Sequence, residues 1–88
     1  MGKFSDNELA ILYKLWRNRC FGKGHMLIDN LIDGFPTGIQ NDISGLVKEL
    51  IRKGILVRKS SKHGHAVYIN LNKRKQIENE LKKKYTFL

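Results

Sequence analysis

The sequence predicts one small α+β domain with a three-helix core, a β-hairpin and a C-terminal helix. Apolar residues recur at helical spacing as far as residue 53, which indicates helices. After Gly54 the apolar residues become β-branched and flank a glycine-containing turn, which is typical of a hairpin. The chain has 88 residues, enough for one hydrophobic core. We therefore expect a single domain over residues 1–88, with the core and hairpin in 5–71 and the last helix and tail in 72–88.

The first helix is expected over residues 6–20. It is preceded by Ser5 and followed into its first turn by Glu8, the two positions of a capping box. The stripe that follows at helical spacing consists of Leu9, Leu12, Tyr13, Trp16 and Cys20. We interpret these residues as core, and Cys20 as a small buried side chain.

The second and third helices are expected over residues 25–33 and 38–53. Gly34 and Pro36 end the second helix, and Thr37 is a candidate cap for the third. The apolar stripe of the third helix consists of Ile39, Ile43, Leu46, Val47, Leu50 and Ile51. Its other face is polar and is therefore expected to lie outside the core.

Two strands and a fourth helix complete the prediction. Residues 55–59 and 65–70 have the strand pattern and are joined by a turn, and Tyr68 is expected to pack against the third helix. The last helix is expected over residues 73–85 with Asn72 as its cap. Its narrow apolar stripe consists of Ile77, Leu81 and Tyr85.

The charges are distributed unevenly along the chain. Seventeen Lys and Arg stand against eight Asp and Glu, a formal net charge of +9. Residues 1–44 hold five bases and five acids, whereas residues 45–88 hold twelve bases and three acids. Eight bases and no acid lie between Arg52 and Lys75. An excess of this kind favours a polyanionic partner, most often nucleic acid, although a solvated basic surface is the simpler alternative.

Two segments carry a resemblance to a known family. Residues 45–59 (GLVKELIRKGILVRK) look like the end of a recognition helix followed by a first wing strand, and residues 63–70 (HGHAVYIN) like a wing tip and returning strand. The chain thus resembles the winged helix-turn-helix domain of small archaeal and bacterial transcriptional regulators over nearly its whole length. The resemblance implies helix 38–53 in the major groove and a basic wing, 58–65, on the DNA backbone or in the minor groove.

The resemblance assigns candidate contacts residue by residue. The polar face of the third helix provides the expected base contacts, Gln40, Asn41, Ser44 and Lys48. The expected phosphate contacts are Arg52, Lys53, Arg58, Lys59, Lys62 and His63. Two features depart from the family pattern: residues 34–38 form a longer connection than the simplest members have, and Asp42 would repel phosphate.

We therefore expect sequence-specific binding of double-stranded DNA by a transcriptional regulator, in the cytoplasm or on the nucleoid of a prokaryote. One alternative is an RNA-binding winged helix. Another is a protein-interaction module in a larger complex, for which the exposed apolar candidates are Phe35, Phe87 and Leu88. A homodimer is expected through the stripe of the last helix, with Leu88 just beyond it, unless that stripe folds back onto the first helix.

Other classes of function find little support in the sequence. No P-loop, no paired carboxylates and no nucleophile motif occur, so we expect no enzyme and no cofactor. His63 and His65 have the only ligand-like spacing, and Cys20 is the one cysteine, so neither a metal site nor a disulfide is expected. No apolar run approaches the ~20 residues of a membrane span. We expect no small-molecule ligand and no leader peptide.

Overall fold

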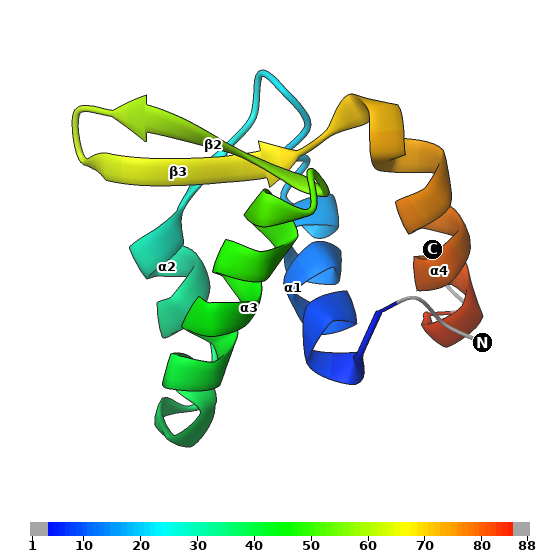
Figure 1. Cartoon of the computed structure of the whole chain (residues 1–88), viewed down its shortest axis with the longest axis horizontal. Coiled ribbons are helices and arrows are strands. Elements are labelled where there is room, and N and C mark those ends of the chain that lie inside the picture. Colours follow the sequence, from blue (N-terminus) through cyan, green and yellow to red (C-terminus); the bar gives the residue numbers. More distant parts are fainter. Residues whose placement is uncertain (1–3, 86–88) are drawn as a thin grey trace.

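The computed structural model describes residues 4–85, which form four α-helices and a three-stranded antiparallel sheet (Figure 1). The predicted α+β class is therefore confirmed. In chain order the elements are α1 (Asp6–Arg17), β1 (Met26–Leu27), α2 (Ile28–Asp33), the 3-10 turn η1 (Thr37–Ile39), α3 (Gln40–Arg52), β2 (Leu56–Ser61), β3 (Gly64–Ile69), the 3-10 turn η2 (Leu71–Lys73) and α4 (Arg74–Lys84).

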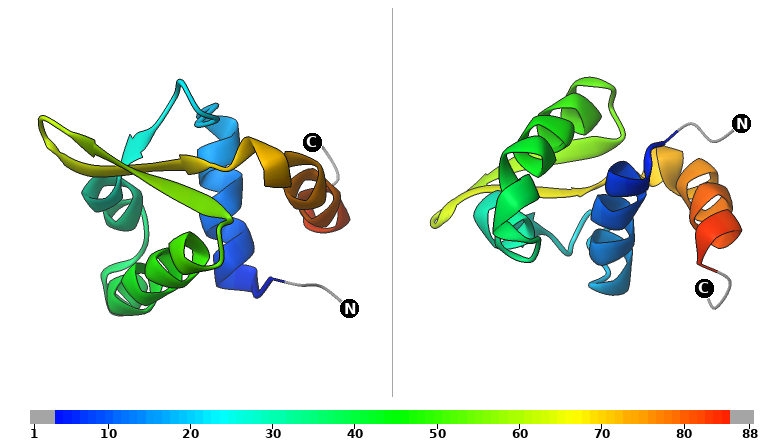
Figure 2. Two further views of the ribbon diagram at one scale, coloured as in Figure 1. Left: turned by 45° about the horizontal axis from the view of Figure 1, so that its top comes forward. Right: turned by 90° about the horizontal axis from the view of Figure 1, so that it is seen from below.

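The sheet has the strand order β1-β3-β2, with β2 and β3 forming the expected hairpin. Its third strand differs from the prediction, which places Met26 and Leu27 in a helix over residues 25–33. These two residues pair with Val67 and Ala66 instead, and α2 begins only after them. A two-residue strand is too short to show an alternating pattern in the sequence. The hairpin extends well beyond the helices at its turn (Figure 2).

The start of α1 agrees with the sequence and its end does not. The Ser5 hydroxyl accepts from the Glu8 amide at 3.2 Å, and the Ser5 amide donates to the Glu8 carboxylate at 2.8 Å, so the capping box is confirmed. The helix ends at Arg17 rather than at residue 20. Arg19 adopts a left-handed conformation with φ 55°, which turns the chain out of the helix. Left-handed residues other than glycine are uncommon, so the sequence carries little signal for this stop.

The third helix is shorter than predicted and begins differently. Residues 37–39 form the turn η1, and α3 begins at Gln40 with no side-chain cap from Thr37 or Ile39. The Gln40 side-chain amide donates to the Phe35 carbonyl at 3.0 Å, a hydrogen bond that spans the turn η1 and stabilises it. At the other end, Gly54 has a φ of 79°, the left-handed conformation in which glycine commonly follows a helix.

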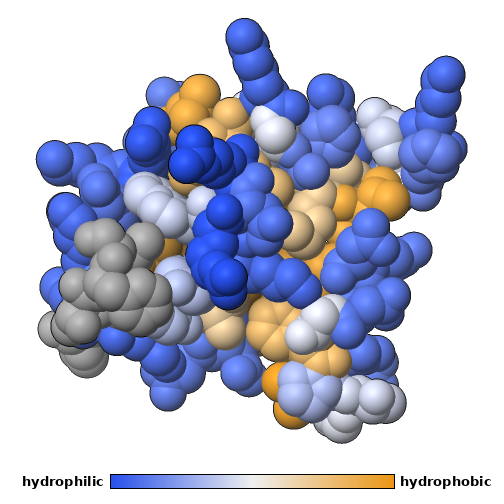
Figure 3. Space-filling view, turned by 180° about the vertical axis from the view of Figure 1, so that it is seen from behind, coloured by the Kyte–Doolittle hydropathy of each residue, from blue (hydrophilic) through white to orange (hydrophobic). Residues whose placement is uncertain are grey.

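The core lies between the inner face of the sheet and the helices. Its fully buried side chains come from every helix and from both long strands, namely Ile11, Leu12, Leu15, Leu31, Ile43, Val47, Leu50, Leu56, Val67, Ile69, Ile77 and Leu81. Cys20 is also buried in this cluster, as expected. Seen from behind, parts of the apolar layer remain visible between polar side chains (Figure 3).

The apolar stripe of the last helix belongs to this core. Ile77 and Leu81 are fully buried, and the Tyr85 ring stacks on the Tyr13 ring of α1 at a centroid distance of 4.0 Å. The stripe therefore folds back onto α1, so the residues expected to form a dimer seam are already covered within one chain. Leu88 lies outside the described residues. The cap also differs from the prediction, because Asn70 and not Asn72 accepts the hydrogen bond at the start of η2.

Candidate nucleic-acid interface

The outer face of α3 is open to solvent. Asn41, Lys48 and Arg52 follow one another at helical spacing and are all exposed. The opposite side of the helix carries the buried residues that pack on the core. No other described segment therefore has to move for this face to reach a partner.

The four expected base contacts differ in how available they are. Asn41 and Lys48 are exposed, whereas Ser44 is half-buried at the margin of the same face. Gln40 is half-buried too, and its amide nitrogen is engaged by the Phe35 carbonyl. Asn41 and Lys48 are thus the side chains of this set that are free to approach a base, and Gln40 acts as a local support of the helix start.

Arg52 is held by a carboxylate that the sequence analysis did not single out. Its guanidinium donates two hydrogen bonds to Glu49, at 2.8 and 2.9 Å. These bonds lower the pKa of the Glu49 carboxyl and raise the pKa of Arg52. The i,i+3 spacing of the two residues was the signal available in the sequence. Lys48 and Lys53, the other bases of α3 and its C-terminus, form no ion pair within residues 4–85, although the charge of Lys53 also helps to lower the pKa of Glu49.

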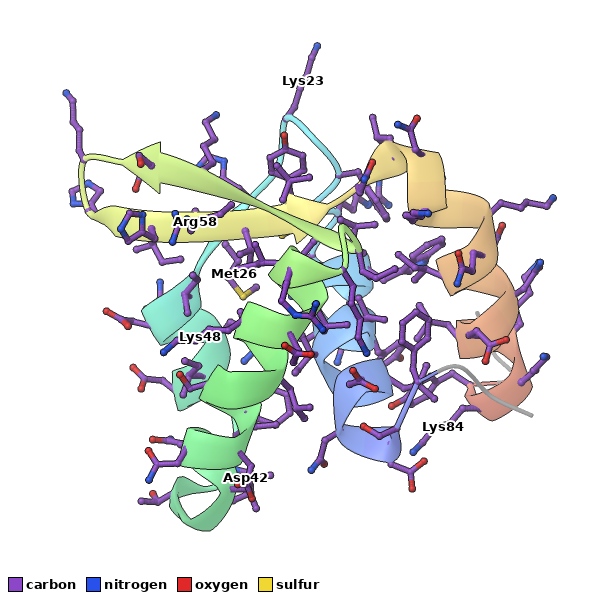
Figure 4. The ribbon with its side chains drawn as sticks, viewed as in Figure 1. Lys23, Met26, Asp42, Lys48, Arg58 and Lys84 are labelled. Atoms are coloured by element: carbon purple, nitrogen blue, oxygen red, sulfur yellow. The ribbon has the colours of Figure 1, made fainter. Side chains whose placement is uncertain are left out.

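The hairpin divides its bases between two faces. Arg58 pairs with Val67, which in turn pairs with Met26, so these three residues share the inner face of the sheet. Lys59 pairs with Ala66 and lies on the outer face. Figure 4 accordingly shows Arg58 and Met26 below the hairpin. The expected phosphate contacts therefore do not form one continuous row.

The remaining expected phosphate contacts lie at the ends of the hairpin. Lys62 and His63 form the turn, where the Ser61 hydroxyl donates to the Gly64 carbonyl at 2.8 Å and accepts from the His63 amide at 3.3 Å. Both side chains are exposed. Lys53 is exposed at the C-terminus of α3, on the way into β2.

All eight acidic residues of the chain lie on helices. The segments 9–28 and 50–77 contain no Asp or Glu, and they include the whole sheet, its connections, most of α1, the last turn of α3 and the first turn of α4. We call this part of the molecule the acid-free sheet region. It contains the hairpin bases and, on the loop before β1, the exposed Lys23. Because this region contains bases and no acids, its charge is positive, as an anionic partner requires.

The lysine run at the end of α4 is much less available as a source of charge. Lys82 lies 3.7 Å from Glu78, Lys83 lies 3.1 Å from Glu80, and Lys84 lies 3.0 Å from Asp6. Exposed ion pairs of this kind add little stability, but they balance the positive charge locally. The end of α4 therefore adds little surplus charge, whereas Lys73, Arg74 and Lys75 at its start, like the bases of the hairpin, have no ion pair within residues 4–85.

Four acids have no ion pair in the described part of the chain: Glu8, which accepts from the Ser5 amide, and Asp29, Asp33 and Asp42, on α2 and in the first turn of α3. Asp42 lies at the end of α3 that is far from the hairpin (Figure 4). The charge along α3 therefore runs from negative at its N-terminus to positive at its C-terminus. This polarity restricts where a phosphate backbone can lie.

The apolar candidates for a protein partner are only partly present in the described structure. Phe35 is half-buried, with the Lys14 ammonium 5.7 Å from its ring centre, and Phe87 and Leu88 lie outside residues 4–85. Among residues 4–85, Leu71 is the one exposed large hydrophobic residue, with 55% of its surface accessible. Nearby in the chain, the Arg74 guanidinium lies 5.0 Å from the Phe21 ring centre and 5.7 Å from that of Trp16.

Residues 4–85 give little support for a metal site, a reactive thiol or a membrane-spanning helix. Three or more potential metal ligands do not come together there, so His63 and His65 have no companions for a metal. Burial raises the pKa of the Cys20 thiol, which opposes thiolate chemistry. No helix among the described residues has the length and apolar character to cross a membrane.

Comparisons with known proteins do not indicate a function, so the proposal below is based on the charges and the exposed side chains. No family model, no curated protein and no solved structure matches this chain.

Proposed function

We propose that this chain is a winged helix-turn-helix domain that binds double-stranded DNA in a sequence-specific manner as a cytoplasmic transcriptional regulator. In this assignment α3 is the recognition helix that enters the major groove and residues 58–65 form the wing. The arrangement of three helices below a projecting β-hairpin supports it (Figure 1). A B-form major groove is about 12 Å wide and admits one helix.

The observation that carries the proposal is the position of the acid-free sheet region next to the open face of α3. Lys48 projects from the middle of α3, and Arg58 projects from the inner face of the hairpin above it (Figure 4). Neither base has a carboxylate partner among residues 4–85. A duplex placed against α3 would meet both, one in the groove and one along its rim.

The charge polarity of α3 sets the expected docking. Asp42 repels phosphate at the N-terminal end of the helix, whereas Lys48 and Lys53 attract it toward the C-terminal end. We therefore infer that the duplex lies toward the C-terminal half of α3 and the wing. Lys48 is then the base reader, because an ammonium can approach the O6 and N7 atoms of guanine, and Asn41 can read adenine where the groove reaches it.

The test is selection of bound sequences from random duplex DNA, followed by titration of the selected site at several salt concentrations. Each neutralised phosphate contributes about −0.9 to the slope of log K against log salt. We expect Lys48→Gln to weaken the selected site and to relax its sequence preference. Lys82→Gln is the matched control, since it removes the same charge from an ion pair on α4.

Three results would contradict the proposal. The first is failure to enrich any duplex sequence, and the second is a salt slope near zero. The third is preferential binding of a hairpin RNA in competition with the selected duplex, which would favour the RNA-binding alternative.

A further inference from the structure

The hairpin has a second surface that the duplex proposal does not use. Successive residues of a strand point to opposite faces, and paired residues of neighbouring strands share a face. Val57 pairs with Tyr68, Lys59 pairs with Ala66, and Ala66 also pairs with Leu27 of β1. These five residues therefore form one surface, which we call the outer sheet face. Arg58 and the core residues Leu56, Val67 and Ile69 lie on the other side.

Four of the five residues of the outer sheet face are hydrophobic; Leu27, Val57 and Ala66 lie outside the core cluster, whereas Tyr68 packs against it. Val57, Tyr68 and Leu27 are half-buried, whereas the residues of the inner face that pack on the helices are fully buried. Helices α1, α2 and α3 lie on the inner side of the hairpin. In the left view of Figure 2, where the top of the molecule is turned toward the reader, the strands lie in front of α1 and α2. Ala66 is fully buried although it is not part of the core cluster.

Tyr68 presents a partly exposed aromatic ring on this face. Among residues 4–85 the ring pairs that involve tyrosine join Tyr13 to Tyr85, and Tyr68 stacks on no other ring. Its cross-strand neighbour is the aliphatic Val57, and Ala66 lies two residues away on the same strand. On this face the ring is therefore bordered by small or aliphatic side chains, and the rest of it packs against the core cluster, so it is half-buried.

Bases and no acids surround this ring. Lys59 is the diagonal neighbour of Tyr68 across the β2–β3 pairing, at a typical backbone separation of about 7–8 Å that long side chains span easily. Lys23 projects upward from the loop before β1, on the same upper side of the hairpin (Figure 4). Both lysines are exposed and lie in the acid-free sheet region.

We propose that the outer sheet face binds single-stranded DNA, with one unpaired base stacked on Tyr68 and the flanking phosphates on Lys59 and Lys23. An aromatic ring beside basic side chains is the combination that binds single strands with little sequence preference, because every base has a flat face. A duplex cannot use this ring without opening, since its bases are already stacked on one another. The choice of DNA over RNA rests on the proposed duplex function, whereas the stacking site itself does not.

The two surfaces lie on opposite faces of one hairpin and can be separated by substitution. The probe is a fluorescein-labelled dT12 oligonucleotide, which forms no duplex, titrated with the full chain and followed by anisotropy. We expect Tyr68→Val to weaken dT12 binding by at least about fivefold, the smallest loss expected for one stacked base, because valine still suits a strand. Tyr68→Phe keeps the ring and should bind dT12 as the unsubstituted chain does.

Two further variants complete the design. Lys59→Gln should weaken dT12 binding and reduce the salt slope by about 0.7, the value for one phosphate of a single strand. Lys48→Gln, on α3, should leave dT12 binding unchanged while it weakens the selected duplex. Urea unfolding of each variant establishes that the fold is retained.

The outcomes distinguish this site from the duplex site. The single-strand proposal is overturned if the unsubstituted chain does not bind dT12, if Tyr68→Phe loses as much affinity as Tyr68→Val, or if Tyr68→Val weakens duplex and dT12 equally. Tighter binding of U12 than of dT12 would overturn the choice of DNA. Loss of duplex binding alone, with dT12 binding intact, contradicts the proposed function and leaves the stacking site supported.

Discussion

Arg58 and Lys59 are neighbours in β2, yet their side chains lie on opposite faces of the sheet. Arg58 shares the inner face with Val67 and Met26, whereas Lys59 shares the outer face with Ala66. The two bases therefore cannot line the same track of phosphates. A wing that contacts duplex DNA through its inner face uses Arg58 and leaves Lys59 free.

This relationship predicts different effects from two matched substitutions. Arg58→Gln should weaken binding to every duplex severalfold and reduce the salt slope by about 0.9, because one phosphate contact is lost. Lys59→Gln removes the same charge from the other face and should change duplex affinity far less. Anisotropy titrations of one duplex at several salt concentrations measure both effects. Equal losses for the two variants would show that the wing does not bind through one face.

Most of the fold could be predicted from the sequence, because its strongest signals are periodic. The stripe of α3 predicts that helix with nearly correct bounds, and the capping box at Ser5 and Glu8 predicts the start of α1. The errors occurred where the structure depends on partners distant in the chain or on rare backbone states. Met26 becomes a strand only because Val67 lies beside it, and Arg19 ends α1 through a conformation that few residues adopt.

The candidate site could be predicted less well, since charge counts say nothing about pairing or faces. The sequence grouped Arg52 with the free bases, but Glu49 one turn earlier holds it in two hydrogen bonds. It also grouped Lys59 with Arg58, although their alternation along a strand separates them. The lysines of α4 contribute to the total charge and yet lie beside carboxylates, one of which, Asp6, comes from the far end of the sequence.

The Glu49–Arg52 pair predicts a substitution that strengthens binding. Glu49→Gln removes a negative charge from the open side of α3 and releases the guanidinium for a phosphate, so duplex affinity should rise severalfold at low salt. The salt slope should grow by about 0.9. Glu78→Gln, which breaks the ion pair with Lys82 on α4, is the control and should leave duplex affinity nearly unchanged. An unchanged affinity in Glu49→Gln would mean that this side of α3 does not contact the duplex.

The position of α4 predicts that its apolar stripe stabilises the monomer. Leu81 is fully buried, so Leu81→Ala should lower the free energy of unfolding by about 3 kcal/mol. Leu71 is 55% exposed, so Leu71→Ala should change the free energy of unfolding by less than about 0.5 kcal/mol. Urea titrations at two protein concentrations give both values. A loss in Leu81→Ala that depends on protein concentration would indicate that α4 contributes to a dimer instead.

Gly45 offers a test that separates stability from binding. It lies in the middle of α3, is exposed, and has open space where a Cβ would be placed. Because glycine weakens a helix interior, Gly45→Ala should stabilise the chain by about 0.5–1 kcal/mol in urea titrations. The added methyl group would nevertheless stand between the helix backbone and the floor of the groove, so duplex affinity should fall.

The control for Gly45→Ala is a substitution that stabilises a helix away from the proposed groove. Asn79 is exposed on α4, and Asn79→Ala should stabilise the chain through helix propensity alone. It should leave duplex affinity unchanged, because α4 takes no part in the docking. A lower affinity only in Gly45→Ala, with higher stability in both variants, would show that the α3 backbone approaches the bases closely. Unchanged affinity in both would place the middle of α3 outside the groove and restrict the contact to the wing.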